Sequence, residues 1–483
     1  MNRLQERAKK LRSRFPASLS TAKAWQTNLA LLLLGSCLVL LSLQLVREYD
    51  NYTIGFSGVS GWSAVVYILS IFIVLTQPVD RYTFPLVLTV AVICRLAVLY
   101  ADPYLSSDVY RYVWDGIVQH AHISPYRYVP GSQSLSFLRT PNQDIFDNIN
   151  RRDYARTIYP PAAQLLFYLV TFISPTLAFM KTTMVLFEGL TLWALNELMC
   201  HLGIRREQSL LYAWCPLLIW EIAGSGHLDS AAMAYIALAL LFRYRGRPVL
   251  TGLFLGLAVM TKLYPLVLVP ALYQRGDRKM PAMLSVVVVT GYAAYSSVGM
   301  LVFGFLGGYI HEEGMATGAR YFLLELIQEV RGFHNLPARV YVGFAILVFV
   351  ILSVWAWRTC CKVDSPPGSF LPVSLGFAAT LMLLFSPHYA WYIAWLVPFF
   401  ALQPDLPILA YLMCFFYLYT TELATPGPKM FLANKILYLL VVIAFCLQLI
   451  LRRWPIHRRF FFPSSLLLVT PMRSAMGGQL SDS

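Results

Sequence analysis

Charged side chains are scarce in this sequence. Only 13% of its 483 residues are Asp, Glu, Lys or Arg, whereas 58% are hydrophobic. A soluble domain is roughly half apolar and about a quarter charged. The composition therefore excludes an ordinary soluble globular protein and indicates an integral membrane protein with many spans.

Three further patterns are absent: paired cysteines, an internal repeat and a cleavable signal. The eight cysteines lie in or beside apolar runs without CxxC spacing, which argues against a disulfide framework or a cysteine metal site. Many secondary transporters contain two related halves, but the large polar interval after the third apolar run has no later counterpart. The first apolar run is long and ends at Arg47, so we interpret it as an uncleaved span.

Long apolar runs recur from residue 25 to residue 451. They lack the alternating pattern of a membrane barrel strand, so we predict an all-α polytopic membrane protein with about 12–14 membrane helices. We expect spans near 25–46, 61–77, 83–100, 178–200, 209–223, 229–243, 281–303, 339–358, 370–386, 389–403, 406–421 and 431–451. Pro265 splits 249–274 into a hairpin, and 161–174 is predicted to be a partial or membrane-surface helix.

The basic residues indicate which side of the membrane each loop occupies. The net charge is +14, and the Lys and Arg residues concentrate at the N-terminus, in short loops and after residue 451. This distribution is typical of cytoplasmic loops, so we do not interpret it as a nucleic-acid interface. We predict a cytoplasmic N-terminus (1–24), a transmembrane domain (25–451) and a cytoplasmic tail (452–483). The loops at about 101–160 and 304–338 then face outward.

Several unusual polar groups fall at the outer ends of the predicted spans. The richest stretch is 100–128, which combines acids, arginines and aromatic rings. Carboxylates beside aromatic rings suit sugar recognition, and a carboxylate can deprotonate a hydroxyl nucleophile. Basic groups suit a phosphate leaving group, because it gains negative charge in the transition state. A lipid-linked phosphosugar needs both features and a groove for its tail. The candidate residues are Asp108, Tyr110, Arg111, Trp114, Asp115, Tyr126, Arg127, Tyr159, His227, Asp229, Lys262, Tyr264, His388 and Tyr389.

The motif SSDVYRYVWDG and the following SPYRY resemble the first-loop signature of GT-C glycosyltransferases. They are most similar to family 87, the bacterial polyprenyl-phosphate-mannose-dependent mannosyltransferases. TIYPPAAQ, GHLDSAA, GLAVMTKLYPLVLVP and SPHYAWY resemble further family blocks in the expected order, so the resemblance covers roughly residues 100–400. It implies a GT-C helical bundle, with 25–451 as the catalytic domain, in the bacterial inner membrane.

The resemblance also implies a reaction. An inverting hexosyltransferase would move a hexose, in particular mannose, from a polyprenyl-phosphate donor to a glycan or lipid-linked acceptor. Asp108 stands where the family has its catalytic base. We expect Lys262, His388 and Arg111 to hold the phosphate and the other candidates to contact the substrates. Phosphate leaves readily once its charge is compensated, so we expect no cofactor and no metal.

Each of these roles has a structural alternative. Asp108 could cap a surface helix, and Asp115 could pair with Arg111 four residues earlier. His227 and Asp229 could cap the next span, and Lys262 could extend toward the interface. At the level of function, the alternatives are a transporter or flippase for lipid-linked sugars and a non-catalytic membrane scaffold.

Acids inside a span are functional candidates by default. Glu188 and Glu197 both lie in the run 178–200, and the sequence does not identify a partner for either.

Overall fold

The computed structural model describes residues 21–47, 54–103, 105–362, 365–386, 389–414 and 428–451. The described part is helical, with no strand among these residues. The predicted all-α fold is therefore confirmed. The predicted tail 452–483, most of the predicted N-terminal segment 1–24, and His388 lie outside the described residues.

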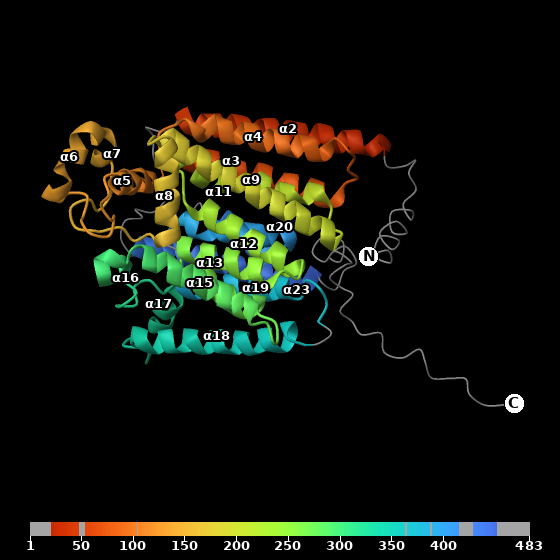
Figure 1. The fold of residues 1–483 in the computed structure, drawn as a ribbon. Helices are drawn as coiled ribbons and strands as arrows, with labels where there is room; N and C mark the ends of the chain where they lie inside the picture. The colour runs from red at the N-terminus through yellow and green to blue at the C-terminus, as the bar shows by residue number, and fades with distance from the viewer. Residues whose placement is uncertain are drawn as a thin grey trace.

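Five helices are long and apolar enough to cross a membrane, within the residues that the structure describes. They are contained in α2 (Thr21–Arg47), α3 (Ile54–Thr76), α9 (Leu177–Leu202), α18 (Ala338–Cys360) and α23 (Pro428–Leu451). Figure 1 shows α2, α4 (Thr83–Leu99), α9 and α18 running in nearly the same direction. Their outer faces expose large apolar side chains such as Leu33 and Ile346. Such faces suit contact with lipid.

The other predicted spans are shorter or broken. The predicted span 281–303 is split into α15 (Lys279–Ala294) and a segment from Ser296 to Glu312 that is bent from it by 110°. The second segment contains η7 (Ser296–Phe303) and α16 (Leu306–Glu312). The remaining helices are α10 (Leu210–Ala213), α11 (Pro216–Leu218), the π-helix η5 (Ile219–Gly224), α12 (Asp229–Tyr244), α13 (Pro248–Thr261), η6 (Tyr264–Leu268), α14 (Val269–Leu272), α17 (Phe322–Gln328), α19 (Phe370–Phe385), η8 (Ala390–Leu396), α20 (Val397–Leu402) and α21 (Leu406–Met413).

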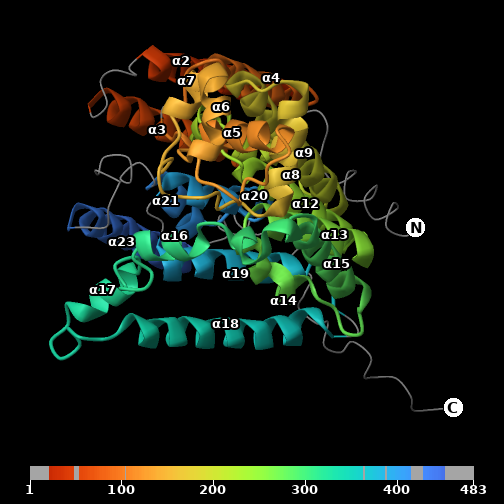
Figure 2. The ribbon, with the colours of Figure 1, turned by 60° about the vertical axis from the view of Figure 1, so that its left-hand side comes forward.

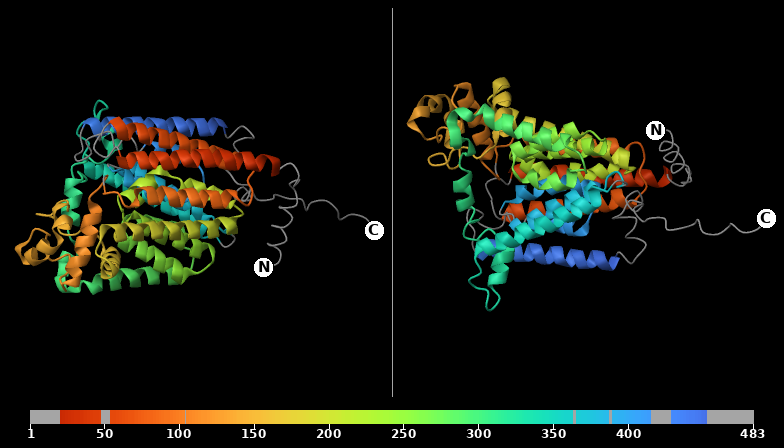
Figure 3. Two further views of the ribbon diagram at one scale, coloured as in Figure 1. Left: turned by 90° about the horizontal axis from the view of Figure 1, so that it is seen from above. Right: turned by 60° about the horizontal axis from the view of Figure 1, so that its bottom comes forward.

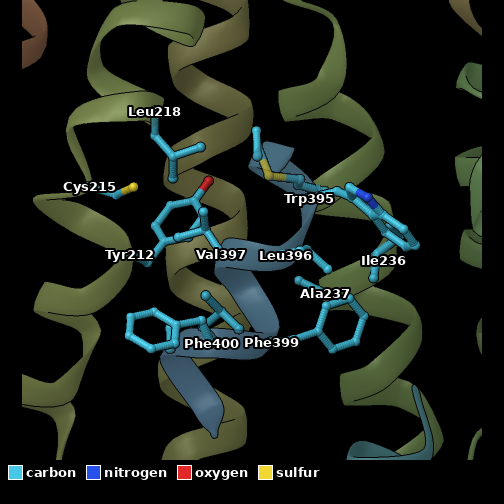
Figure 4. Close-up of a cluster of buried hydrophobic side chains, with 14 of the residues drawn as sticks. Tyr212, Cys215, Leu218, Ile236, Ala237, Trp395, Leu396, Val397, Phe399 and Phe400 are labelled. Atoms are coloured by element: carbon cyan, nitrogen blue, oxygen red, sulfur yellow. The ribbon is translucent and has the colours of Figure 1, made fainter. Parts of the chain in front are cut away.

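The centre of the bundle is built around α12. Thirteen of its side chains are buried, and five of these are alanines. A helix that is apolar on all sides belongs in a core, and small residues let neighbouring helices approach closely. Figure 4 shows Ile236 and Ala237 of α12 beside Trp395 and Phe399, with Phe400 on the other side of α20.

The segment 101–160 forms a separate cap on one end of the bundle. It contains α5 (Asp108–His120), α6 (Ser136–Arg139), α7 (Gln143–Asp147) and the short 3₁₀ turns η2 (Gln133–Leu135) and η3 (Thr140–Asn142). Figure 2 shows α16 at the same end, and Figure 3 shows the orange segment projecting there from two further directions. α8 (Pro161–Ile173) runs crosswise to the long helices (Figure 1), in the region where the sequence predicts a partial or surface helix.

Close packing of α8 against α5 holds this cap in place. A Cβ atom added to Gly116 would lie 2.2 Å from Thr171 Oγ1 and 2.7 Å from the backbone oxygen of Phe167. We therefore expect Gly116→Ala to destabilise the protein by about 2 kcal/mol, because overpacking forces a backbone shift. Thermal unfolding in detergent measures this. A Cβ at Gly189 meets nothing within 4 Å, so an equal loss of stability in Gly189→Ala would contradict the explanation.

Candidate functional site

A cavity of about 700 Å³ lies among the elements at this end of the bundle. Its walls are formed by the start of α5, the chain before α8, the turn after α13, the loop at about 304–338, the end of α19 and the start of η8. Its described lining residues are Leu105, Ser106, Ser107, Asp108, Arg111, Asn150, Arg151, Ala155, Arg156, Ile158, Tyr159, Pro160, Thr261, Lys262, Leu263, Tyr264, Leu306, Tyr309, Met315, Arg320, Leu381, Met382, Phe385, Tyr389, Trp391 and Tyr392. Besides Asp108, five of the residues selected from sequence are among them: Arg111, Tyr159, Lys262, Tyr264 and Tyr389.

Asp108 contributes the only carboxylate among the described lining residues. It is the first residue of α5, where the helix dipole favours a negative charge. The cap position belongs to Ser107, whose side chain makes no capping bond. Asp108 Oδ1 instead accepts a hydrogen bond from Asn150 Nδ2 at 2.9 Å. The carboxylate is thus oriented by a neutral amide, and its alternative role as a helix cap is not the arrangement observed.

Two buried tyrosines lie close to Asp108. The rings of Tyr112 and Tyr159 meet edge to face with centroids 5.0 Å apart. Burial raises the pKa of both phenols well above the usual value, and the nearby charge of Asp108 raises it further. Both phenols therefore stay protonated at neutral pH.

Five basic side chains also line the cavity, and four of them are paired with a carboxylate. The pairs are Arg111–Asp115 at 2.8 Å, Arg151–Glu312 at 2.7 Å, Lys262–Asp229 at 2.8 Å and the short pair Arg320–Glu313. The Arg151–Glu312 pair joins the segment 101–160 to α16. The fifth basic residue is Arg156. Sequence reasoning missed Arg151, Arg156 and Arg320, although the basic run RRDYAR directly precedes the TIYPP motif.

Lys262 reaches the cavity because α13 stops one residue before it. Lys262 has an extended backbone, and the nearby Pro265 lies in the short helix η6. Proline lacks an N–H and cannot continue α13. The Lys262 side chain is 16% exposed, whereas that of Asp229 is fully buried. The ammonium of Lys262 therefore lies between a buried carboxylate and the cavity.

Aromatic rings form one wall of the cavity. Tyr389 stacks on Trp391 with centroids 4.5 Å apart, and Trp391 stacks on His227 at 4.4 Å. His227 is fully buried, with Nε2 3.2 Å from Glu221 Oε2. His227 thus lies behind the wall and touches Trp391, not the cavity. Trp391 was missed from sequence, although it belongs to the SPHYAWY motif.

Seven residues selected from sequence do not line the cavity. His227 and Asp229 lie behind its wall, and the other five belong to the segment 101–160. Trp114 packs on Phe146 in a small core of the cap, and Tyr126 is buried and donates to the Tyr159 carbonyl oxygen at 2.7 Å. Asp115 binds Arg111 and Gln164. Tyr110 is partly buried against the cores, and Arg127 is exposed. These side chains are turned away from the cavity because a cap outside the bundle needs a core of its own, and one face of α5 supplies part of that core.

We also searched the described residues for a metal site. Within the described ranges, no group of three or more His, Cys, Asp and Glu side chains is arranged to hold a metal ion. His120 contacts Thr171 Oγ1 at 3.1 Å and stacks on Tyr168. The expectation that the reaction needs no metal stays a prediction.

These features define a class: a polytopic helical membrane protein with a largely apolar cavity, lined also by several arginines, at one end of its bundle. The model of the alpha-(1→6)-mannopyranosyltransferase family, N-terminal domain, matches residues 9–274, more than half of the 483-residue chain. The chain therefore belongs to this mannosyltransferase family and is a membrane glycosyltransferase. A search of curated proteins found no match.

Proposed function

We propose that this protein is an inverting mannosyltransferase of the GT-C type, similar to family 87. The donor is a polyprenyl-phosphate mannose, and the acceptor is a hydroxyl of a glycan or glycolipid. The reaction takes place at the membrane face opposite the cytoplasm, in the cavity beside α5. Family membership supports the sugar and the reaction class, and the cavity supports the lipid-phosphate donor.

The observation that carries the proposal is the environment of Asp108. It is the one cavity carboxylate within the described structure, and it accepts from a neutral amide rather than from a cation. A carboxylate of this kind can take a proton from the acceptor hydroxyl. The acceptor oxygen then bonds to the anomeric carbon from one face. The bond from that carbon to the phosphate oxygen breaks on the other face, and its electron pair leaves with the phosphate.

The remaining walls of the cavity suit the phosphate, the isoprenoid chain and the sugar of the donor. Basic side chains, among them Lys262 and Arg111, are close enough to the cavity to balance charge that develops on the leaving phosphate. Leu381, Met382 and Phe385 form an apolar wall from the end of α19. Such a surface suits the isoprenoid chain. The stacked rings of Tyr389 and Trp391 suit the apolar face of a sugar. The residues thus supply a base, charge compensation and a lipid contact without a cofactor.

One experiment separates this transferase from the alternative flippase. The purified protein is given polyprenyl-phosphate mannose labelled in the sugar, together with a mannoside acceptor. We expect labelled acceptor and free polyprenyl phosphate in equal amounts, because each transfer breaks one sugar–phosphate bond. GDP-mannose serves as the control donor and should give no product. A flippase would move the intact donor between leaflets, so an unconsumed donor would refute the transferase.

A further inference from the structure

The charges around the cavity are almost completely balanced by the protein itself. Each of Arg111, Arg151, Lys262 and Arg320 has a carboxylate within salt-bridge distance. Those carboxylates would repel an incoming anion, and a ligand that displaced one would leave it unpaired at a cost. A cation in such a pair therefore attracts a phosphate less strongly than an unpaired cation at the same place would.

Arg156 differs from the other four. No carboxylate of the described residues lies within salt-bridge distance of it. It lines the cavity and is partly buried. A guanidinium carries its positive charge at all physiological pH values. Arg156 is thus the one lining cation whose charge the described protein does not balance.

The backbone around Arg156 is held from several directions. Arg111 Nη1 donates to the carbonyl oxygen of Ala155 at 3.2 Å, and Gln164 Nε2 donates to Thr157 Oγ1 at 2.7 Å. The backbone N–H of Phe305 donates to the carbonyl oxygen of Thr157 at 3.1 Å. α5, α8 and the second outer loop therefore all fix the segment that presents Arg156.

The second outer loop approaches the segment around Arg156 so closely that one of its positions, Gly304, requires a glycine. Gly304 has φ +56°, and a Cβ there would lie 1.8 Å from the carbonyl oxygen of Thr157. Only glycine fits this contact without moving the segment. The two outer loops thus meet directly beside Arg156.

The guanidinium of Arg156 is also oriented. Its Nε donates to the carbonyl oxygen of Arg127 at 3.2 Å. Among the described residues, its two Nη groups have no hydrogen-bond partner. The Nη edge of a guanidinium can donate to two oxygens of one phosphate. Arg127, which was selected from sequence for its side chain, therefore contributes through its backbone.

We propose that Arg156 is the principal phosphate-binding residue of the cavity. This inference rests on the proposed function. In the donor the phosphate is a diester with one negative charge, and after transfer it is a monoester that gains a second. A preorganised cation stabilises that increase in the transition state. Arg156 therefore binds the donor and, more strongly, the isoprenoid monophosphate that leaves.

The test measures turnover and inhibition by farnesyl phosphate, a short isoprenoid monophosphate. For Arg156→Gln we expect kcat and the affinity for farnesyl phosphate to fall by about 10- to 100-fold, the value of a charged hydrogen bond. Arg156→Lys keeps the charge but loses the planar fork, so it should give intermediate values. Inhibition by farnesol, which has the same chain without a phosphate, should be unchanged.

Arg152→Gln is the matched control. Arg152 lies four residues earlier, pairs with Asp147 at 3.2 Å and does not line the cavity. It should keep wild-type turnover and inhibition, and thermal unfolding should show that both Gln variants are folded. A folded Arg156→Gln protein that farnesyl phosphate inhibits as strongly as wild type would refute the role of Arg156. A wild-type protein that releases no lipid phosphate would instead refute the proposed function.

Discussion

Asp108→Asn is expected to abolish mannosyl transfer. A positioned general base contributes about 10²- to 10⁴-fold to a rate, and an amide cannot accept the hydroxyl proton. The substitution keeps the shape of the side chain and an oxygen that can accept from Asn150 Nδ2. We therefore expect a folded protein that binds donor but transfers mannose at least about 100-fold more slowly. Transfer of labelled mannose in proteoliposomes measures the rate.

Asp144→Asn provides the control for this prediction. Asp144 is exposed on α7 in the same segment 101–160 and does not line the cavity. Its substitution removes the same charge and should leave transfer within about twofold of wild type, as expected for a surface site. Comparable losses in both variants would indicate a general charge effect, and full activity of Asp108→Asn would remove Asp108 as the base.

Glu188→Ala is expected to destabilise the protein by about 3–5 kcal/mol, because it leaves an arginine charge buried without a partner. Arg95 on α4 binds both carboxylate oxygens of Glu188 on α9, at 2.8 and 3.3 Å. Both side chains are nearly inaccessible. Arg95 also donates to the carbonyl oxygen of Ala213. The pair therefore joins two long helices to the broken segment after α9. Chemical unfolding in detergent measures the loss.

Glu197→Ala is the matched control on the same helix. Glu197 pairs with Arg245 at 2.6 Å, but both side chains are about one third exposed. Exposed pairs contribute about 0–1 kcal/mol. The double variant Arg95→Met/Glu188→Leu should recover most of the stability, because an apolar pair can replace a buried ion pair. If the double variant stayed as unstable as Glu188→Ala, loss of packing rather than an unpaired charge would be the cause.

Glu188 and Glu197 also show the limit of sequence reasoning about charge in a span. Both were functional candidates because acids are costly in lipid. Arg95 precedes Glu188 by 93 residues and lies in another predicted span. Nothing in the local pattern connects the two. The contact exists because α4 and α9 pack together, and that packing depends on the whole bundle.

The residues of α5 show the same limit at the site. The sequence identified Asp108, Arg111, Trp114 and Asp115 as one motif, and all lie on one helix. Asp108 and Arg111 line the cavity, whereas Trp114 enters the core of the cap. Successive side chains on a helix point in different directions. Which direction faces a substrate depends on what packs against the helix, here α7, α8 and α9.

The amino-acid sequence by itself determined that this is an all-helical membrane protein, and it placed Asp108, Lys262, Tyr264 and Tyr389 near one another. Both the length of an apolar run and the charge of a loop are local properties of the sequence. They determine by themselves whether a segment is buried in lipid and on which side a loop lies. Only the tertiary structure decided which charges neutralise each other. Arg151 and Glu312 are 161 residues apart in the chain, and a salt bridge acts only over a few ångströms. That pairing leaves Asp108 and Arg156 as the cavity groups without an opposite charge among the described residues.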